Sequence, residues 1–173
     1  MRKSLIAYYS RTGNNYVAGR IMNLTVGNTA VIAKKIQGLT GGDLFEIKTL
    51  KEYPTDYMKT TEVSKVELRN NARPELSEKV KYLGQYDIVY LGYPNWWSTM
   101  PMAVFTFLES YDFIGKTIVP FCTHEGSGLG KSENDIKRLC PDSSVLRGFA
   151  LLGSTVEKAD EEVRNWLKNQ QLI

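Results

Sequence analysis

The sequence is poor in the residues that form metal sites and disulfides. Its 173 residues include two cysteines, Cys122 and Cys140, and one histidine, His124. Neither cysteine has the spacing of a metal ligand, and a single histidine cannot complete a zinc site. Unpaired cysteine is often a core residue. We therefore expect two buried or incidental thiols rather than redox or catalytic ones.

Long apolar runs and blocks of one charge are also absent. No apolar stretch approaches the roughly 18 residues that a membrane-spanning helix needs, so no membrane partner is expected. The N-terminal run Leu5–Tyr9 is too short for a signal-peptide core and lacks a small-residue cleavage site, which predicts a cytoplasmic protein. The formal net charge is +3, with Lys and Arg spread among Asp and Glu. Nucleic acid is therefore not an expected partner, whereas acidic proteins and phosphorylated cofactors fit this charge.

Several well-known catalytic and nucleotide-binding patterns are missing as well. The sequence contains neither Gly-x-Gly-x-x-Gly nor the full pattern Gly-x-x-x-x-Gly-Lys-Ser/Thr, the fingerprints of dinucleotide-binding folds and P-loops. It also has no Ser-His-Asp or Cys-His arrangement at a plausible spacing, which argues against hydrolysis.

What the sequence does contain is a regular alternation of strand and helix patterns. Short apolar runs predict strands at Leu5–Tyr9, Asp43–Ile47, Tyr86–Tyr93, Lys116–Cys122 and Ser144–Leu152. Helices are predicted at Asn28–Gln37, Glu75–Leu83, Pro101–Tyr111, Gly130–Leu139 and Val156–Leu167. This alternation indicates one α/β domain over residues 1–173, a five-stranded parallel sheet of order 2-1-3-4-5 between layers of helices.

The two ends of the first helix can be predicted from the residues beside it. Asn28 or Thr29 is a suitable cap, and Gly38 is a suitable stop.

Residues 51–73 have a mixed composition rich in charged residues. We expect them to form a surface excursion that is partly helical over residues 57–70.

Three polar loops follow three of the predicted strands, at residues 10–14, 94–99 and 123–128. The carboxyl ends of parallel strands meet at one edge of a sheet, where open α/β sheets bind ligands. The first loop is rich in hydroxyls, the second is aromatic and the third exposes backbone amides. Together they indicate a phosphorylated, planar ligand that forms hydrogen bonds.

The first loop has the composition of a phosphate site. Ser10 and Thr12 supply hydroxyls and Gly13 permits close approach of the backbone, whereas Arg11 either pairs with a phosphate or points to solvent. A phosphate site needs donors that converge on a helix N-terminus. A plain turn is an equally good explanation of this segment taken alone.

An insertion separates this loop from the first predicted helix. Residues 15–26 are expected to form an extra hairpin or loop that turns near Gly19, after which the Gly-Asn pair of the first loop recurs at residues 27–28. We infer that the insertion splits the phosphate loop. Its upstream half is Ser10, Arg11 and Thr12, and its downstream half is Asn28 and Thr29.

The second loop carries two adjacent tryptophans, Trp96 and Trp97, behind Pro94 and Asn95. Tryptophan provides a large apolar area and a flat face for stacking. One interpretation is that both indoles cap the core above the next helix. Because adjacent side chains diverge, we favour one that packs inward and one that faces the ligand, and we assign Trp96 to the ligand wall.

In the third loop, Gly126, Ser127 and Gly128 expose N–H groups that suit the carbonyl oxygens or ring nitrogens of a heterocycle. Thr123 and His124 lie at the same rim. A lone histidine is more often structural than catalytic, so no catalytic role is assigned to His124.

These three motifs resemble those of the flavodoxin family of FMN-binding proteins. Residues 8–14 resemble the family's phosphate motif, residues 92–97 with Met100-Pro101 its second flavin loop, and residues 121–130 its third. The resemblance spans nearly the whole chain. It implies a flavodoxin-like three-layer α/β/α sandwich with FMN, not NAD, as the tightly held group and the isoalloxazine ring between the second and third loops. Two features depart from the family: the insertion, and a slightly basic charge where many electron carriers are strongly acidic.

The resemblance leaves three functions open. The first is a shuttle that carries electrons to a redox partner protein through bound flavin. The second is an NAD(P)H-dependent FMN oxidoreductase that acts on quinones or similar small molecules, and the third is a binding module without flavin. On either of the first two interpretations the flavin supplies the chemistry and the protein tunes it.

Overall fold

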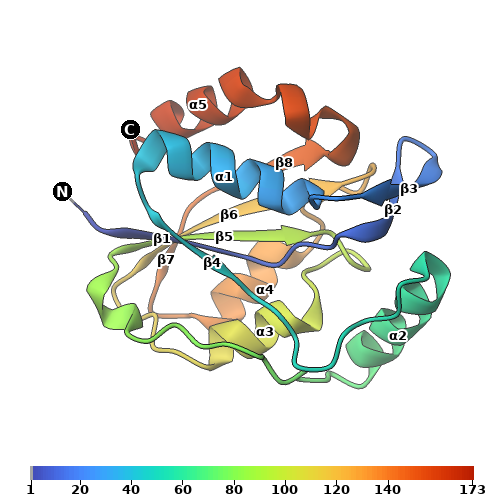
Figure 1. Ribbon diagram of the computed structural model, residues 1–173. Helices are drawn as coiled ribbons and strands as arrows, with labels where there is room; N and C mark the ends of the chain where they lie inside the picture. Colours follow the sequence, from blue (N-terminus) through green and yellow to red (C-terminus); the bar gives the residue numbers. More distant parts are fainter. Residues whose placement is uncertain (1) are drawn as a thin grey trace.

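The apolar runs of the sequence form the strands of a parallel sheet. The computed structural model describes residues 2–173, and its main sheet has the order β4-β1-β5-β6 with two further strands beside β6 (Figure 1). The strands are β1 (Ser4–Tyr8), β4 (Asp43–Glu46), β5 (Ile88–Pro94), β6 (Thr117–His124), β7 (Ser144–Val145) and β8 (Phe149–Leu152). Every residue of β1 is buried, as expected for a strand covered on both faces.

Helices cover both faces of this sheet. On one face lie α1 (Asn28–Thr40) and α5 (Asp160–Asn169), and on the other lie α3 (Met102–Glu109) and α4 (Ser132–Leu139) (Figure 1). The first layer packs through residues such as Ile32 and Val163, and the second through Phe107 and Ile136. The predicted three-layer α/β class is therefore confirmed. Within residues 2–173, every helix is too short or too polar to cross a bilayer.

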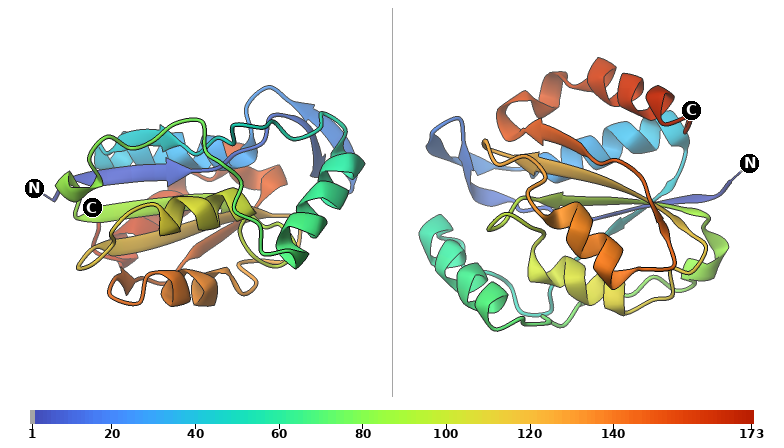
Figure 2. Two further views of the ribbon diagram at one scale, coloured as in Figure 1. Left: turned by 90° about the horizontal axis from the view of Figure 1, so that it is seen from below. Right: turned by 180° about the vertical axis from the view of Figure 1, so that it is seen from behind.

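Two elements lie beyond the carboxyl ends of the strands. The insertion forms an antiparallel hairpin of β2 (Gly13–Val17) and β3 (Arg20–Leu24), which confirms the predicted turn near Gly19. The excursion after β4 contains α2 (Tyr57–Arg69), whose first turn is capped by the carboxylate of Asp56. Figure 2 shows the hairpin and α2 at the same end of the molecule, away from the chain termini.

The count of five strands was wrong, because the predicted strand Ser144–Leu152 is two short segments. Both β7 and β8 pair in parallel with β6, so the sheet has six strands. Between them the backbone N–H of Gly148 bonds to Oε1 of Glu133, 2.6 Å away, instead of to the sheet. A Cβ on Gly148 would lie 3.0 Å from the Leu129 side chain, which explains the break at a glycine.

The predicted helix Glu75–Leu83 was also wrong. This segment is extended near its start, where Leu76 forms an antiparallel bridge with Thr49, and only Leu83–Gln85 form a 3₁₀ turn. The backbone of this segment pairs with the chain after β4 instead: Leu50 donates its N–H to the carbonyl of Glu75, and Ser77 donates its N–H to the carbonyl of Lys48. At the C-terminus, a 3₁₀ segment (Gly153–Lys158) replaces the first turn of the predicted helix Val156–Leu167.

The ends of α1 differ from their prediction. The helix continues past Gly38 to Thr40 and ends at Gly41, which has φ 68° and donates its N–H to the carbonyl of Gln37. Its N-cap is Gly27, so Asn28 and Thr29 lie inside the first turn. Because glycine has no side chain, the cap hydroxyl must come from elsewhere in the chain.

Candidate functional site

A cavity of about 330 Å³ opens at the carboxyl ends of β1, β5 and β6. It lies where open α/β sheets bind ligands, and its size falls within the range of small-molecule sites. The lining includes nine residues selected from the sequence: Arg11, Asn28, Thr29, Pro94, Asn95, Trp96, Thr123, His124 and Ser127. The topology therefore brings the three loops together as expected.

Five selected residues lie outside this lining. Ser10 is half-buried and bonds to the start of α1, Thr12 is exposed, and Trp97 lines a neighbouring cavity. Gly126 and Gly128 have φ of 138° and 60°, so they shape the third loop. The residues that sequence reasoning missed are Asn15, Tyr16, Tyr57, Glu125 and Gly153. Of these, only Glu125 lies in one of the three loops that the sequence indicated, residues 123–128. Its charged side chain, next to His124, could have marked it as a residue of the site.

Ser10 supplies the cap that α1 lacks. Its Oγ accepts a hydrogen bond from the backbone N–H of Ala30 at 3.1 Å, and Ala30 is the third residue of the helix, the usual partner of an N-cap side chain. A Cβ on Gly27 would lie 2.2 Å from this Oγ and 2.5 Å from the carbonyl oxygen of Arg11. The two halves of the split loop are therefore packed directly against each other.

This packing leaves a cradle for an anion at the start of α1. The N–H of Ala30 bonds to Ser10 and that of Val31 to the carbonyl of Gly27. The N–H groups of Asn28 and Thr29 have no intrahelical acceptor, because they belong to the first turn. Both residues line the cavity. Such amides, together with the helix dipole, favour a phosphate.

The guanidinium of Arg11 is held by backbone carbonyls at the wall of the cavity. Its guanidinium donates to the carbonyls of Asn14, Pro54 and Thr55, at distances of 2.9, 3.0 and 2.9 Å. These contacts join the first loop, the hairpin and the segment before α2. Arg11 is half-buried and lines the cavity, so its positive charge is fixed at the wall.

The second loop is a tight turn held in an unusual conformation. Trp96 and Thr99 exchange backbone hydrogen bonds of 2.9 and 3.2 Å, and the two residues between them, Trp97 and Ser98, have φ of 56° and 69°. Left-handed backbone is costly for residues other than glycine and persists where the surroundings enforce it. Here Asn95 does so: its Oδ1 accepts from the N–H of Ser98 and its Nδ2 donates to the carbonyl of Gly128.

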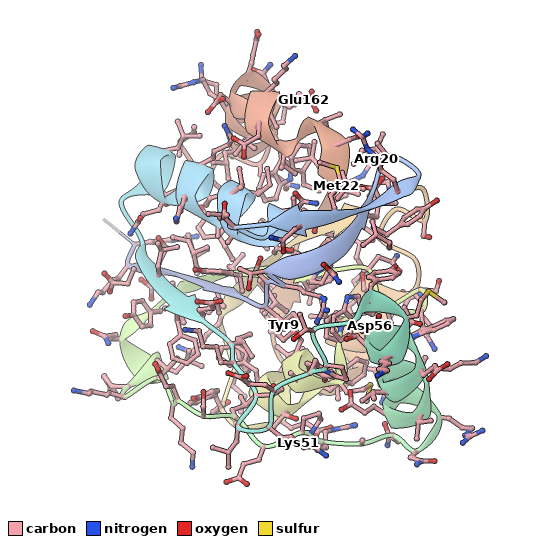
Figure 3. All side chains as sticks on the ribbon, turned by 45° about the vertical axis from the view of Figure 1, so that its right-hand side comes forward. Tyr9, Arg20, Met22, Lys51, Asp56 and Glu162 are labelled. Carbon is pink, nitrogen blue, oxygen red and sulfur yellow. The ribbon has the colours of Figure 1, made fainter. Side chains whose placement is uncertain are left out.

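The turn directs its two indoles to different neighbours. Trp96 is half-buried and meets Tyr9 and Tyr53 edge to face, with ring centroids 5.3 and 5.2 Å away. Trp97 is 44 % exposed, and its Nε1 donates to Oγ of Ser64 in α2 at 3.0 Å. Trp96 lines the cavity and Trp97 does not. In Figure 3, Tyr9 lies between the body of the sheet and the start of α2 at Asp56.

The third loop fixes the orientation and tautomer of His124. The Nδ1 atom accepts a hydrogen bond from the N–H of Gly126 at 2.9 Å, so the neutral ring carries its proton on Nε2. Burial lowers the pKa of His124 from its ordinary value, and the carboxylate of Glu125 opposes this shift. Below this loop, the hydroxyls of Thr123 and Thr29 lie 2.8 Å apart and join β6 to α1.

Glu125 places a negative charge at the same wall. Its Oε2 accepts from the N–H of Ala18 in the hairpin turn at 2.9 Å. Asn28 is close by, because a Cβ on Gly153 would lie 2.4 Å from Nδ2 of Asn28 and 2.5 Å from Oε1 of Glu125. Glycine at position 153 therefore gives these two side chains room.

Neither thiol lines the cavity. Cys122 and Cys140 are free and buried, as expected from the sequence, and burial raises the pKa of both, that of Cys140 to about 11. Such thiols are poor nucleophiles. Within residues 2–173, no cluster of three or more His, Cys, Asp or Glu side chains is suited to a metal ion.

Comparison with known proteins identifies the class of this fold and site. A model of the flavodoxin family matches residues 3–170. Two solved structures of putative flavoproteins are similar: one from Bacteroides eggerthii is 35% identical, with 97% of each chain covered and a TM-score of 0.77. The other, from Bacteroides uniformis, is 31% identical, covers 96% of this chain and 98% of its own, and has a TM-score of 0.76.

A flavoprotein from Lactobacillus acidophilus, solved in complex with FMN, shares the fold at 22% identity. It covers 91% of this chain and 98% of its own, with a TM-score of 0.64. A search of curated proteins finds no significant match. The family match over nearly the whole chain establishes that this protein belongs to the flavodoxin family.

Proposed function

We propose that this protein binds FMN in the 330 Å³ cavity and works as a flavodoxin-like redox protein. The observation that carries the proposal is the anion cradle, in which Gly27 brings the first loop against the N-terminus of α1 and the cavity is lined by Asn28 and Thr29, whose N–H groups have no intrahelical acceptor. The FMN complex of the Lactobacillus flavoprotein supports the choice of ligand.

The residues present fit such a group. The phosphate would be held by the start of α1, where the helix dipole and free amides favour negative charge. The ring would lie between the second and third loops, with Trp96 as its apolar wall. His124 would offer the Nε2–H donor, because its Nδ1 is occupied by Gly126. When bound, FMN supplies the redox chemistry, and these residues orient it and set its surroundings.

The first partner we propose is a redox protein that exchanges electrons with the bound cofactor. The net charge of +3 favours an acidic partner, because charge complementarity speeds encounter. Many electron carriers of the flavodoxin family are strongly acidic, whereas this protein is slightly basic. The partner of this protein would therefore differ from theirs in the sign of its charge.

A second candidate is an NAD(P)H-dependent oxidoreductase that acts on small molecules. It is favoured by a further cavity of about 190 Å³ beside the first, between the second loop and α2. An electron shuttle that docks on a protein surface has no need of such a compartment.

Titration of flavin-free protein with FMN and with riboflavin tests the shared proposal. We expect quenching of flavin fluorescence and tighter binding of FMN, because only FMN carries the phosphate. Failure to take up FMN would refute the proposal. Stopped-flow mixing of the FMN-loaded protein with NADPH, without oxygen, then separates the two candidates: rapid bleaching supports the oxidoreductase, and no bleaching supports the shuttle.

A further inference from the structure

A groove of about 580 Å³ lies between α2 and the second loop, and we call it the α2–Trp97 groove. Its lining is mostly apolar surface and comes from Glu62, Lys65, Val66, Leu68, Arg69 and Trp97. Leu68 packs against the hydrophobic core, whereas Val66 is 44 % exposed. In Figure 1, α2 lies at the margin of the molecule, outside the helix layers that cover the sheet. The groove is therefore a surface feature with a floor that the core supports.

The indole of Trp97 is fixed at this groove without being buried. Trp97 is 44 % exposed, and its backbone has φ 56°, a conformation that is costly for a side chain of this size. Its Nε1 donates to Oγ of Ser64 at 3.0 Å, and Nζ of Lys65 lies 5.4 Å from the centroid of its ring. An exposed tryptophan that is already ordered is typical of the residues that dominate the binding energy of protein interfaces.

The charge at the groove is mainly positive. Lys65 and Arg69 are exposed and lie four residues apart, on one side of α2. Within residues 2–173 neither of them forms an ion pair, and Glu62 is the one carboxylate of the lining. Because the chain carries a net charge of +3, electrostatics disfavour a second copy as the occupant. An acidic protein would supply the carboxylates that the two cations lack.

The groove adjoins the proposed flavin site through the second loop. Trp97 lines both the groove and the cavity of about 190 Å³, and that cavity shares Trp96 with the first one. A partner that contacts the indole of Trp97 would therefore lie one residue away from the wall of the proposed flavin site. Such closeness suits the exchange of electrons.

We propose that the α2–Trp97 groove docks an acidic segment of the redox partner protein. An apolar side chain of the segment packs on Val66, Leu68 and the indole of Trp97. Carboxylates on either side of it pair with Lys65 and Arg69. The inference rests on the proposed function only for the redox role of the partner, because the groove is complete without a bound flavin.

Fluorescence anisotropy with a labelled synthetic peptide tests the docking surface. The probe is the blocked peptide Glu-Glu-Leu-Phe-Glu-Glu-Leu-Phe-Glu-Glu, which combines carboxylates with apolar anchors. It is titrated at low salt with flavin-free protein and with FMN-loaded protein. We expect saturable binding of equal strength to both, and weaker binding at high salt. A peptide with serine in place of Leu and Phe should bind at least tenfold more weakly.

Two charge-reversed variants separate the groove from the net charge of the protein. Lys65→Glu/Arg69→Glu should weaken binding of the peptide at least tenfold. Arg164→Glu/Lys168→Glu is the matched control, because these residues are also exposed and four residues apart, on α5, and the change in net charge is the same. The control should weaken binding less than threefold.

Two valine substitutions test the apolar part of the groove. Val66→Ser should weaken binding of the peptide at least threefold. Val63→Ser makes the same change on the same helix, at a residue that is 39 % exposed and outside the lining of the groove. It should leave the affinity within twofold of the wild-type value. Thermal melting checks that each variant is folded.

Absence of peptide binding, or equal losses in the groove variants and their controls, would overturn the assignment. So would a dimer in sedimentation that Lys65→Glu/Arg69→Glu dissociates, or binding of phosphatidylglycerol vesicles that Val66→Ser removes, because the groove would then have another occupant. Groove-dependent peptide binding without uptake of FMN would refute only the proposed function. Uptake of FMN without peptide binding would refute only this inference.

Discussion

The carboxylate of Glu125 and the backbone N–H of Ala18 are joined by a hydrogen bond of 2.9 Å, although 107 residues separate them in the sequence. The bond ties the turn of the inserted hairpin to the third loop. It also holds a negative charge beside Asn28, at the start of α1. Glu125 therefore has two opposing effects on a bound phosphate: it fixes the hairpin and repels the anion.

The substitution Glu125→Gln separates these effects, because glutamine retains an acceptor for Ala18 and loses the charge. We expect affinity for FMN to rise about threefold to tenfold at low salt, as for removal of a repulsion of about 1 kcal/mol. Affinity for riboflavin, which has no phosphate, should not change. Fluorescence titration measures both, and exposed Glu161→Gln is the control. An equal gain for both flavins would contradict the electrostatic explanation.

Gly27→Ala should disrupt the anion cradle, because its Cβ would lie 2.2 Å from Oγ of Ser10. We expect the affinity for FMN to fall at least tenfold. Gly38→Ala in the same helix is the matched control, since a Cβ there meets nothing within 4 Å. It should stabilise the protein by about 0.5–1 kcal/mol in urea denaturation and leave FMN affinity unchanged. Equal affinities of the two variants for FMN would contradict the proposed anion cradle.

His124 should make the site sensitive to mild acid. Burial lowers its pKa in the folded protein, so the unfolded chain takes up the proton first as the pH falls. Stability from the neutral ring is present above the unfolded value of about 6.5 and is lost as the pH drops through the lower folded value. Protonation of Nδ1 also removes the bond from Gly126.

We therefore expect wild-type protein to lose more stability between pH 7.5 and 5.5 than His124→Asn, whose amide oxygen retains an acceptor. Urea denaturation at both pH values measures the difference. Parallel losses in the two proteins would show that the titration of His124 makes no contribution.

Trp96→Ala removes an apolar wall that also packs on Tyr9 and Tyr53. We expect weaker flavin retention and a loss of about 2 kcal/mol or more in unfolding free energy. Water would reach the ring and ease the addition of negative charge, so the lower of the two reduction potentials should rise. Spectroelectrochemistry measures the potentials, and Trp97→Ala, outside this cavity, should shift them less. Unchanged affinity and potentials would reject the assignment of Trp96.

Much of the fold could be predicted because buried parallel strands have a strong sequence signal. The runs at β1, β5 and β6 are almost continuously apolar, and each ends in a polar loop. Once these strands are parallel, their loops must meet at one edge, which is why nine selected residues share one cavity. The local capping rule failed at α1 because the cap, Ser10, precedes the helix by the whole length of the hairpin.

The missed residues depend on packing that no local pattern encodes. Tyr57 reaches the cavity because Arg11 binds the carbonyls just before α2, and Tyr57 also stacks on Tyr16 of the hairpin. Gly153 lines the cavity because the chain after β8 passes beside α1. The segment after Pro74 has a helical composition, but its backbone pairs with residues near Thr49. In each case a tertiary contact decided the outcome.

The hairpin has ends that lie side by side, because its first residue, Gly13, pairs with its last, Leu24. Its length is therefore uncoupled from the loop that it interrupts, and lengthening or shortening it by whole residue pairs leaves Ser10 and Gly27 where they are. New chain termini or a reporter domain placed just after Gly19, past the N–H of Ala18 that bonds to Glu125, would sit near the cavity and leave Ser10 and Gly27 in place. The turn is a natural attachment point for a sensor.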